Sequence, residues 1–140
     1  QFIDQFTAFG ALVAAAPPTP EQAEDLDFLL TLGQLFTQVV YGQLICESAA
    51  LAIDGVDGGS REGSVADMSD LTEAHVDRIF AVFVRDFSEF ALSLYGQPAA
   101  NDEQRDAALG LVRRPIIDAA AEGAFVDEVL SYDGAYAMRP

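Results

Sequence analysis

The sequence has few side chains of the kinds that catalysis most often uses. It holds one cysteine, Cys46, and one histidine, His75, and all seven basic side chains are arginine. A single cysteine excludes an internal disulfide and a zinc site built on several cysteines. A glycine-rich phosphate loop, a GxSxG segment and an HExxH segment are all absent from the sequence. We therefore assign no catalytic residue and no metal ligand from the residues alone.

Positive charge is scarce. Seven arginines stand against 23 aspartates and glutamates, and the formal net charge is −16 at pH 7. Such a chain repels the phosphates of nucleic acids and the anionic face of a membrane, so we expect neither as a partner. The acidic surface is interpreted as solvated. A docking surface for a basic partner and an adaptation to high salt are the alternatives.

Signals for export or membrane insertion are weak. Residues 1–16 lack the basic start of a signal peptide. Residues 26–53 are long and apolar, but polar residues interrupt them, so we expect no membrane span and a cytoplasmic location. The interrupting residues are Asp27, Gln34, Gln38, Gln43 and Glu47. The chain starts at Gln1 within a helical pattern, which leaves open that it is the C-terminal part of a longer enzyme.

Length and periodicity predict one helical domain over residues 1–140. Hydrophobic residues make up 51% and charged residues 21%, as in globular proteins. Apolar residues recur at helical spacing, so the predicted fold class is all-α, a bundle of four to five helices. The expected helices are 2–15, 20–53, 71–95, 101–114 and 119–130, followed by an irregular tail. Residues 54–70 are glycine-rich and predict a flexible loop. An EF-hand calcium site is excluded there, because Val56 and Gly58 stand at positions that need oxygen ligands.

Capping residues and apolar stripes refine these helices. The capping pairs are Thr19 with Gln22, Asp70 with Glu73, and Asn101 with Gln104. The first stripe is Phe2, Phe6, Phe9 and Val13. The second is Leu26, Leu29, Leu30, Gly33, Phe36, Val40, Leu44 and Cys46, widened by Leu32, Leu35, Val39 and Tyr41, which predicts a central helix. The third is Val76, Ile79, Phe80, Phe83, Phe87, Phe90, Ala91 and Leu94. Gly33 and Gly42 either allow close approach of a neighbour or mark a bend.

Glu47 and Arg85 stand in apolar helical segments, where a lone charge is costly to bury. The structural interpretation pairs Arg85 with neighbours of Asp86, or with Glu47 across the bundle. The functional alternative makes Glu47 a general base whose pKa is raised by burial. We favour the structural interpretation, because no substrate-binding element accompanies Glu47.

Three further candidates receive structural interpretations. His75 is expected at the surface or beside a helix cap, since nothing in the sequence places a nucleophile and a carboxylate next to it. Arg113 and Arg114 could clamp a phosphate or carboxylate, but two cations also suit the C-terminal end of a helix dipole, which we prefer. Cys46 is expected to be a packed thiol without a basic neighbour to activate it.

Three segments in order resemble the C-terminal end of large bacterial acyl-CoA dehydrogenases. They are LFTQVVYGQLICESAAL (35–51), VDRIFAVFVRDFSEFALSLYGQP (76–98) and VRRP (112–115), and the likeness covers residues 26–118. Enzymes of that family have an N-terminal helical domain, a middle β-domain and a C-terminal helical bundle. They bind FAD and oxidise acyl-CoA with the help of a glutamate base.

The resemblance implies a structural role for this chain within such an enzyme. FAD and acyl-CoA would be bound mainly by parts outside it, and its partners would be the remainder of the enzyme or another subunit of a homo-oligomer. The family's base lies in a Tyr-Glu-Gly-like context, whereas Tyr41 and Tyr95 are each followed by Gly-Gln, so no catalytic residue is carried over. The alternatives are a free-standing acidic helical module that binds a protein, and a small enzyme using Glu47 and Arg85.

Overall fold

The computed structural model describes residues 1–53 and 72–131, and all regular structure in these ranges is helical. Five helices follow one another: α1 (Phe2–Ala15), α2 (Leu26–Ile53), α3 (Glu73–Tyr95), α4 (Asp102–Leu111) and α5 (Ala119–Ser131). The prediction of an all-α bundle is confirmed. The loop expected at 54–70 and the tail 132–140 lie outside the described residues.

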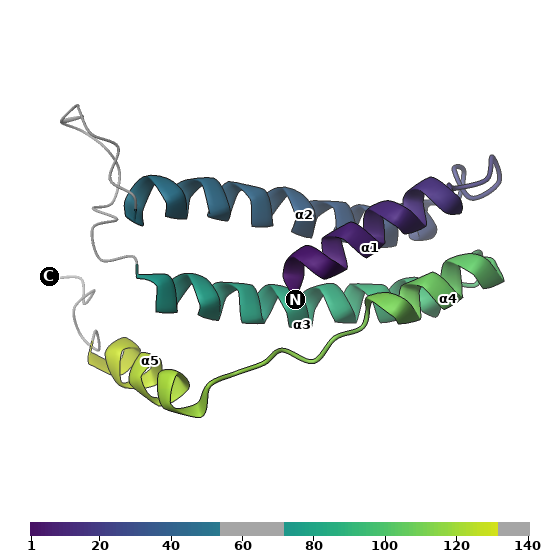
Figure 1. Cartoon of the computed structure of the whole chain (residues 1–140). Helices are drawn as coiled ribbons and strands as arrows, with labels where there is room; N and C mark the ends of the chain where they lie inside the picture. Colours follow the sequence, from purple (N-terminus) through teal and green to yellow (C-terminus); the bar gives the residue numbers. More distant parts are fainter. Residues whose placement is uncertain (54–71, 132–140) are drawn as a thin grey trace, which may run out of the picture.

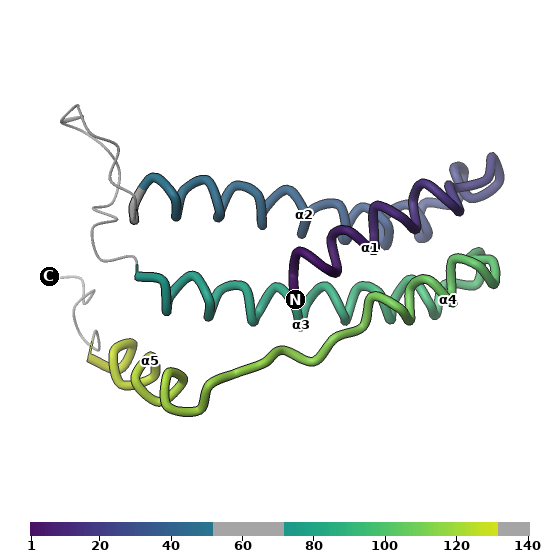
Figure 2. Tube along the Cα trace, in the orientation of Figure 1, coloured from purple at the N-terminus to yellow at the C-terminus, as the bar shows by residue number. Residues whose placement is uncertain are grey.

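Helix α3 is the centre of the bundle. It packs along α2 in the opposite direction and also contacts α1, α4 and α5 (Figure 1). The prediction that residues 20–53 form the central helix is therefore wrong. After α4 the chain is extended over residues 112–118 and runs back beside α3 to reach α5 (Figure 2).

The core lies where α1, α2, α3 and α4 meet. Phe9 of α1 packs edge-on against Phe87 of α3, with ring centroids 5.8 Å apart, and against Phe36 of α2 at 4.9 Å. The other buried core residues are Leu12, Ala16, Phe28, Leu32, Leu35, Ala91, Leu94, Ala100, Ala108 and Leu111. Those that come from α2 lie in its first half and those that come from α3 in its second half, so the ends of α2 and α3 near residues 53 and 72 contribute nothing to this core.

Helix α1 has the predicted bounds but a shifted buried face. Phe9 is buried as expected, whereas Phe6 is 46% exposed and Gln5 is completely buried. Gln5 takes the core position because its amide nitrogen lies within hydrogen-bond distance of Leu111 O (2.9 Å), Ser88 Oγ (3.0 Å) and Val84 O (3.1 Å). These three acceptors replace the water that the buried amide nitrogen loses.

The main predicted stripe of α2 is wrong, because it lies on the exposed side of the helix, whereas Leu32 and Leu35, two of the residues predicted to widen it, are buried. The residues that α2 buries are Phe28, Thr31, Leu32, Leu35, Gly42 and Ala49. The α2 outer face consists of Leu26, Leu29, Leu30, Phe36, Val40, Tyr41, Leu44 and Leu51, which are 38% to 67% exposed. At 3.6 residues per turn these eight residues span an arc of about 140°. Both sides of the helix are apolar, so periodicity could not tell which one packs.

Helix α2 is long and apolar enough to cross a membrane by length and composition, over Leu26–Leu51. A single helix of this kind is weak support for a span, because core helices of soluble proteins meet the same criterion. No membrane span is established, and the expectation of none stays a prediction.

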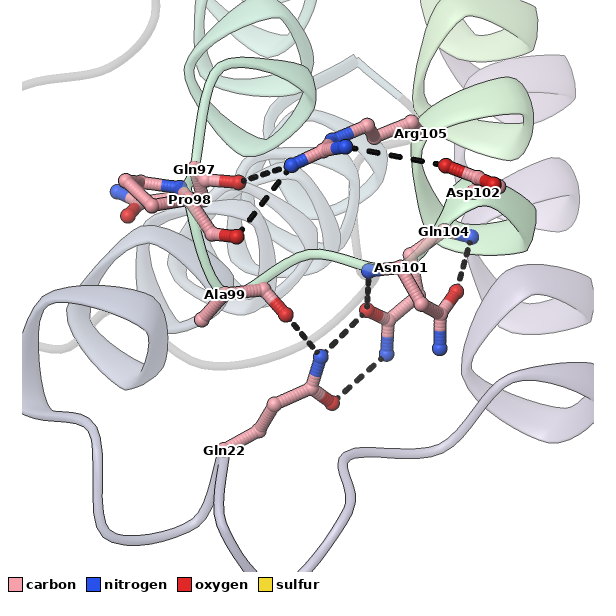
Figure 3. Close-up of polar contacts among 8 residues, drawn as sticks. All are labelled: Gln22, Gln97, Pro98, Ala99, Asn101, Asp102, Gln104 and Arg105. Atoms are coloured by element: carbon pink, nitrogen blue, oxygen red, sulfur yellow. Dashed lines mark hydrogen bonds and ion pairs between the residues drawn. The ribbon is translucent and has the colours of Figure 1, made fainter.

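Helix ends follow their caps. The Thr19–Gln22 capping box forms, but it closes only one turn, and α2 begins at Leu26 after Asp25 Oδ1 accepts a hydrogen bond from Phe28 N at 3.0 Å. Helix α3 is capped by Thr72 instead of Asp70. The predicted Asn101–Gln104 box is confirmed (Figure 3), although α4 ends at Leu111 and not at Arg114.

Candidate functional site

Among the described residues, a pocket that is partly open to solvent lies between α3, α5 and the extended residues 112–118. Its volume is about 560 Å³. We call it the α3–α5 cavity. Its apolar lining includes Phe2, Phe80, Val84, Ile116, Ile117, Ala121 and Phe125, and its polar lining includes His75, Asp77, Arg78, Asp118, Glu122 and Glu128.

The N-terminal residues of the chain hold one side of the cavity in place. Gln1 Nε2 donates to Arg114 O at 2.9 Å, and Gln1 Oε1 accepts from Ile116 N at 3.0 Å. The Phe2 ring packs against the Phe80 ring in a tilted arrangement, with ring centroids 5.2 Å apart. The extended segment is thus fixed against α1, so the isoleucines that follow Arg114 can form a wall of the cavity.

Two polar contacts and one aromatic residue attach α5 over the cavity. Arg78 forms a bidentate ion pair with Glu122, and its guanidinium carbon lies 5.7 Å from the centroid of the Phe125 ring. His75 Nε2 lies 2.9 Å from Glu128 Oε2, and the His75 and Phe125 rings are 6.0 Å apart. No residue of α5 is fully buried. The helix is therefore held mainly by these contacts and not by a packed core.

His75 is a capping residue of α3, which agrees with the prediction that it lies beside a helix cap. Its Nδ1 accepts from Thr72 N at 3.2 Å, and Thr72 Oγ1 accepts from His75 N at 3.3 Å. A ring nitrogen that accepts this bond carries no proton, so the proton sits on Nε2 and points to Glu128. The three-residue spacing of Thr72 and His75 is a signal in the sequence from which the cap could be predicted. Nothing in the sequence indicates that Glu128 contacts His75.

The order hydroxyl, imidazole, carboxylate resembles a catalytic triad, since Thr72 Oγ1 also lies 3.2 Å from His75 Nδ1. In a triad the imidazole lone pair is reserved for the proton of the nucleophile. Here the Thr72 backbone N–H competes for that lone pair, and the Thr72 hydroxyl is itself an acceptor of the helix cap. The group is accordingly a helix start tied to α5, and no nucleophile is assigned.

Glu47 and Arg85 do not meet. Glu47 is exposed and accepts a hydrogen bond from Gln43 Nε2 at 2.9 Å, so the burial that a general base would need is missing. Arg85 is exposed and pairs with Asp86 itself at 2.8 Å, and this hydrogen bond and charge raise the pKa of Arg85. The predicted pair between Glu47 and Arg85 is wrong, because both side chains point to solvent.

The predictions for Arg113 and for Cys46 have different outcomes. Arg113 Nη1 donates to Gly110 O at 2.7 Å and to Val112 O at 2.9 Å, which supports the interpretation as a cation at a helix C-terminus. Cys46 is exposed, so the prediction of a packed thiol is wrong. Among residues 1–53 and 72–131 no cluster of three potential metal ligands occurs.

Comparison of the chain with known protein families, curated proteins and solved structures gave no match.

Proposed function

We propose that the chain is a structural part of a larger cytoplasmic enzyme, the C-terminal helical bundle of a flavin-dependent acyl-CoA dehydrogenase-like protein. The sequence resemblance over residues 26–118 motivates the proposal. The α2 outer face is the observation that carries it. Through this face the chain would pack against the remainder of the enzyme or another subunit of a homo-oligomer.

The α2 outer face has the character of a surface that becomes buried. Its eight large apolar residues lie on one side of a single helix, and soluble monomers rarely leave such a contiguous apolar surface uncovered. Residues 28–46 carry no charged side chain, although the whole chain has a net charge of −16. Lack of charge makes this face cheap to desolvate on association.

The role of the chain in such an enzyme would be assembly and not chemistry. Glu47 is exposed, and four polar groups of the α3–α5 cavity are engaged in the ion pairs Arg78–Glu122 and His75–Glu128. FAD and acyl-CoA would then be bound mainly by parts of the enzyme outside this chain. The bundle would supply a rigid surface onto which those parts fold.

Native purification from the source organism tests this function. We expect yellow material with a flavin absorbance spectrum and an intact mass well above 15.0 kDa, either in one polypeptide or with a copurifying one. Colourless, monodisperse material of 15.0 kDa would contradict the proposal.

Substitutions locate the contact. With a flavin-containing partner on a separate polypeptide, replacing Val40 and Leu44 by Gln should release that partner, since both side chains lie on the α2 outer face and are 56% and 50% exposed. The matched control replaces Leu92 and Leu109, which are 48% and 45% exposed on α3 and α4. Equal loss of the partner in both variants would argue against this face as the contact.

A free-standing acidic module that binds a protein partner is the second candidate. Its support is the charge distribution, because Arg78, Arg85 and Arg105 pair with acids and leave many carboxylates in excess. A surface of this kind would bind a basic protein with an affinity that falls as salt is added. Colourless material with such salt-dependent binding would favour this candidate over the enzyme.

A further inference from the structure

We propose that the α3–α5 cavity binds a small apolar molecule that carries a positive charge, of the alkylammonium class. The inference does not depend on the function proposed above. No residue of α2 lines the cavity, so a ligand there and a partner on the α2 outer face can be tested separately.

The size and walls of the cavity suit a small apolar ligand. Its volume of about 560 Å³ lies within the range of roughly 300–1,000 Å³ that is common for small-molecule sites. Its aromatic rings come from three helices, with Phe2 on α1, Phe80 on α3 and Phe125 on α5. An alkyl group placed between these rings would lose its contact with water, which favours binding.

The charges around the cavity select the sign of the ligand. Its carboxylates are Asp77, Asp118, Glu122 and Glu128, and its basic groups are Arg78 and His75. The ion pair with Glu122 neutralises Arg78, and His75 is turned toward Glu128. Asp77 and Asp118 therefore leave the lining negative, which attracts a cation and repels an anion.

The aromatic residues strengthen the preference for a cation. Arg78 lies over the Phe125 ring at 5.7 Å and occupies that face, so a ligand cation would have to meet the other aromatic rings of the lining, Phe2 and Phe80. Ammonium groups bind aromatic rings in the same way, by attraction to the negative face of the ring. An alkylammonium ion would combine this attraction with burial of its alkyl chain.

Calorimetric titration with hexyltrimethylammonium and with hexyl sulfate tests the ligand class. We expect saturable binding of the cation at one site and binding of the anion that is at least about ten-fold weaker, because the lining repels it. Equal affinities, or no binding of the cation, would overturn the proposal.

Filling the cavity tests the location. Ala121 lines the cavity from an exposed position on α5, so Ala121→Phe should abolish binding of the cation without unfolding the protein. Its neighbour Ala120 is also exposed but does not line the cavity, and Ala120→Phe is the matched control. Retained binding in Ala121→Phe would overturn the proposal.

Removing one carboxylate separates the site from general attraction to an acidic protein. Asp77→Asn should weaken binding of the cation about two- to five-fold, the effect of one partly solvated charge. Asp106→Asn removes the same charge from α4, away from the cavity, and should leave the affinity unchanged. Equal weakening in both variants would show binding to the acidic surface as a whole and would overturn the proposal.

Discussion

Gln22 and Gln104 form a reciprocal amide pair between the turn before α2 and the start of α4 (Figure 3). Gln22 Nε2 donates to Gln104 Oε1 at 2.8 Å, and Gln104 Nε2 donates to Gln22 Oε1 at 3.0 Å. Each amide oxygen also accepts a hydrogen bond from a backbone N–H three residues earlier in the chain. Gln22 Oε1 accepts from Thr19 N, and Gln104 Oε1 accepts from Asn101 N. The capped turn before α2 and the start of α4 are far apart in the sequence and are fixed to one another by the two amides that also cap them.

Gln104→Ala should destabilise the protein by about 2–3 kcal/mol, because it removes a cap, the bond to Ala16 O and two hydrogen bonds to Gln22, whose amide keeps Ala99 O and Thr19 N as partners. Urea unfolding followed by circular dichroism at 222 nm measures the change. Gln34→Ala is the control, since Gln34 is exposed on α2, and its cost should stay within about 0.5 kcal/mol. Equal costs would show that the pair adds nothing beyond the helix surface.

Gln5 should tolerate an apolar replacement better than a charged one. Its Nε2 faces three acceptors, while its buried Oε1 has no hydrogen-bond partner. Gln5→Leu loses the bonds but also removes the orphan oxygen, at a cost of about 1–2 kcal/mol. Gln5→Glu places a carboxylate among carbonyl oxygens and should cost more than about 3 kcal/mol at pH 7.

The pH dependence of Gln5→Glu checks this account. Only the protonated acid can donate to Val84 O or Leu111 O, so the pKa of the new carboxyl group is raised in the folded protein. A raised folded-state pKa means that the destabilisation is present at neutral pH and shrinks as the pH falls through that pKa. Unfolding free energies of Gln5→Glu and Gln5→Leu that run in parallel with pH would contradict it.

Local signals in the sequence were sufficient to predict the helices. They were not sufficient to predict how the helices pack against one another. The bounds of α1 and the Asn101–Gln104 cap follow from proline positions and from cap spacing, which act over a few residues. The buried side of α2 cannot be predicted in this way, because apolar residues surround the helix. Contact with α3 determines which of them are buried. The α3–α5 cavity depends on Glu122 and Glu128 meeting residues of α3, and such pairings leave no sequence pattern.

Gly42 and Gly33 on α2 should respond oppositely to alanine. A β-carbon at Gly42 would overlap the Phe2 ring, whereas none of the neighbouring atoms lies within 4 Å of one at Gly33. Gly42→Ala should therefore cost about 1–3 kcal/mol by overpacking. Gly33→Ala should stabilise the protein by about 0.5–1 kcal/mol through helix propensity. Thermal unfolding measures both, and a similar shift for the two variants would rule out the close approach of Phe2.

Arg78→Ala should detach α5 while the rest of the bundle stays folded. The substitution removes the ion pair with Glu122 and the contact with Phe125, and α5 has no buried residue that would keep it in place. Arg85→Ala is the matched control on the same helix, because Arg85 is exposed and, within the described part of the chain, forms its ion pair with the neighbouring Asp86. Hydrogen exchange should show protection lost over residues 119–131 in Arg78→Ala and kept in Arg85→Ala. Unchanged protection in α5 would mean that its attachment does not depend on this ion pair, and would leave the His75–Glu128 contact as the main link.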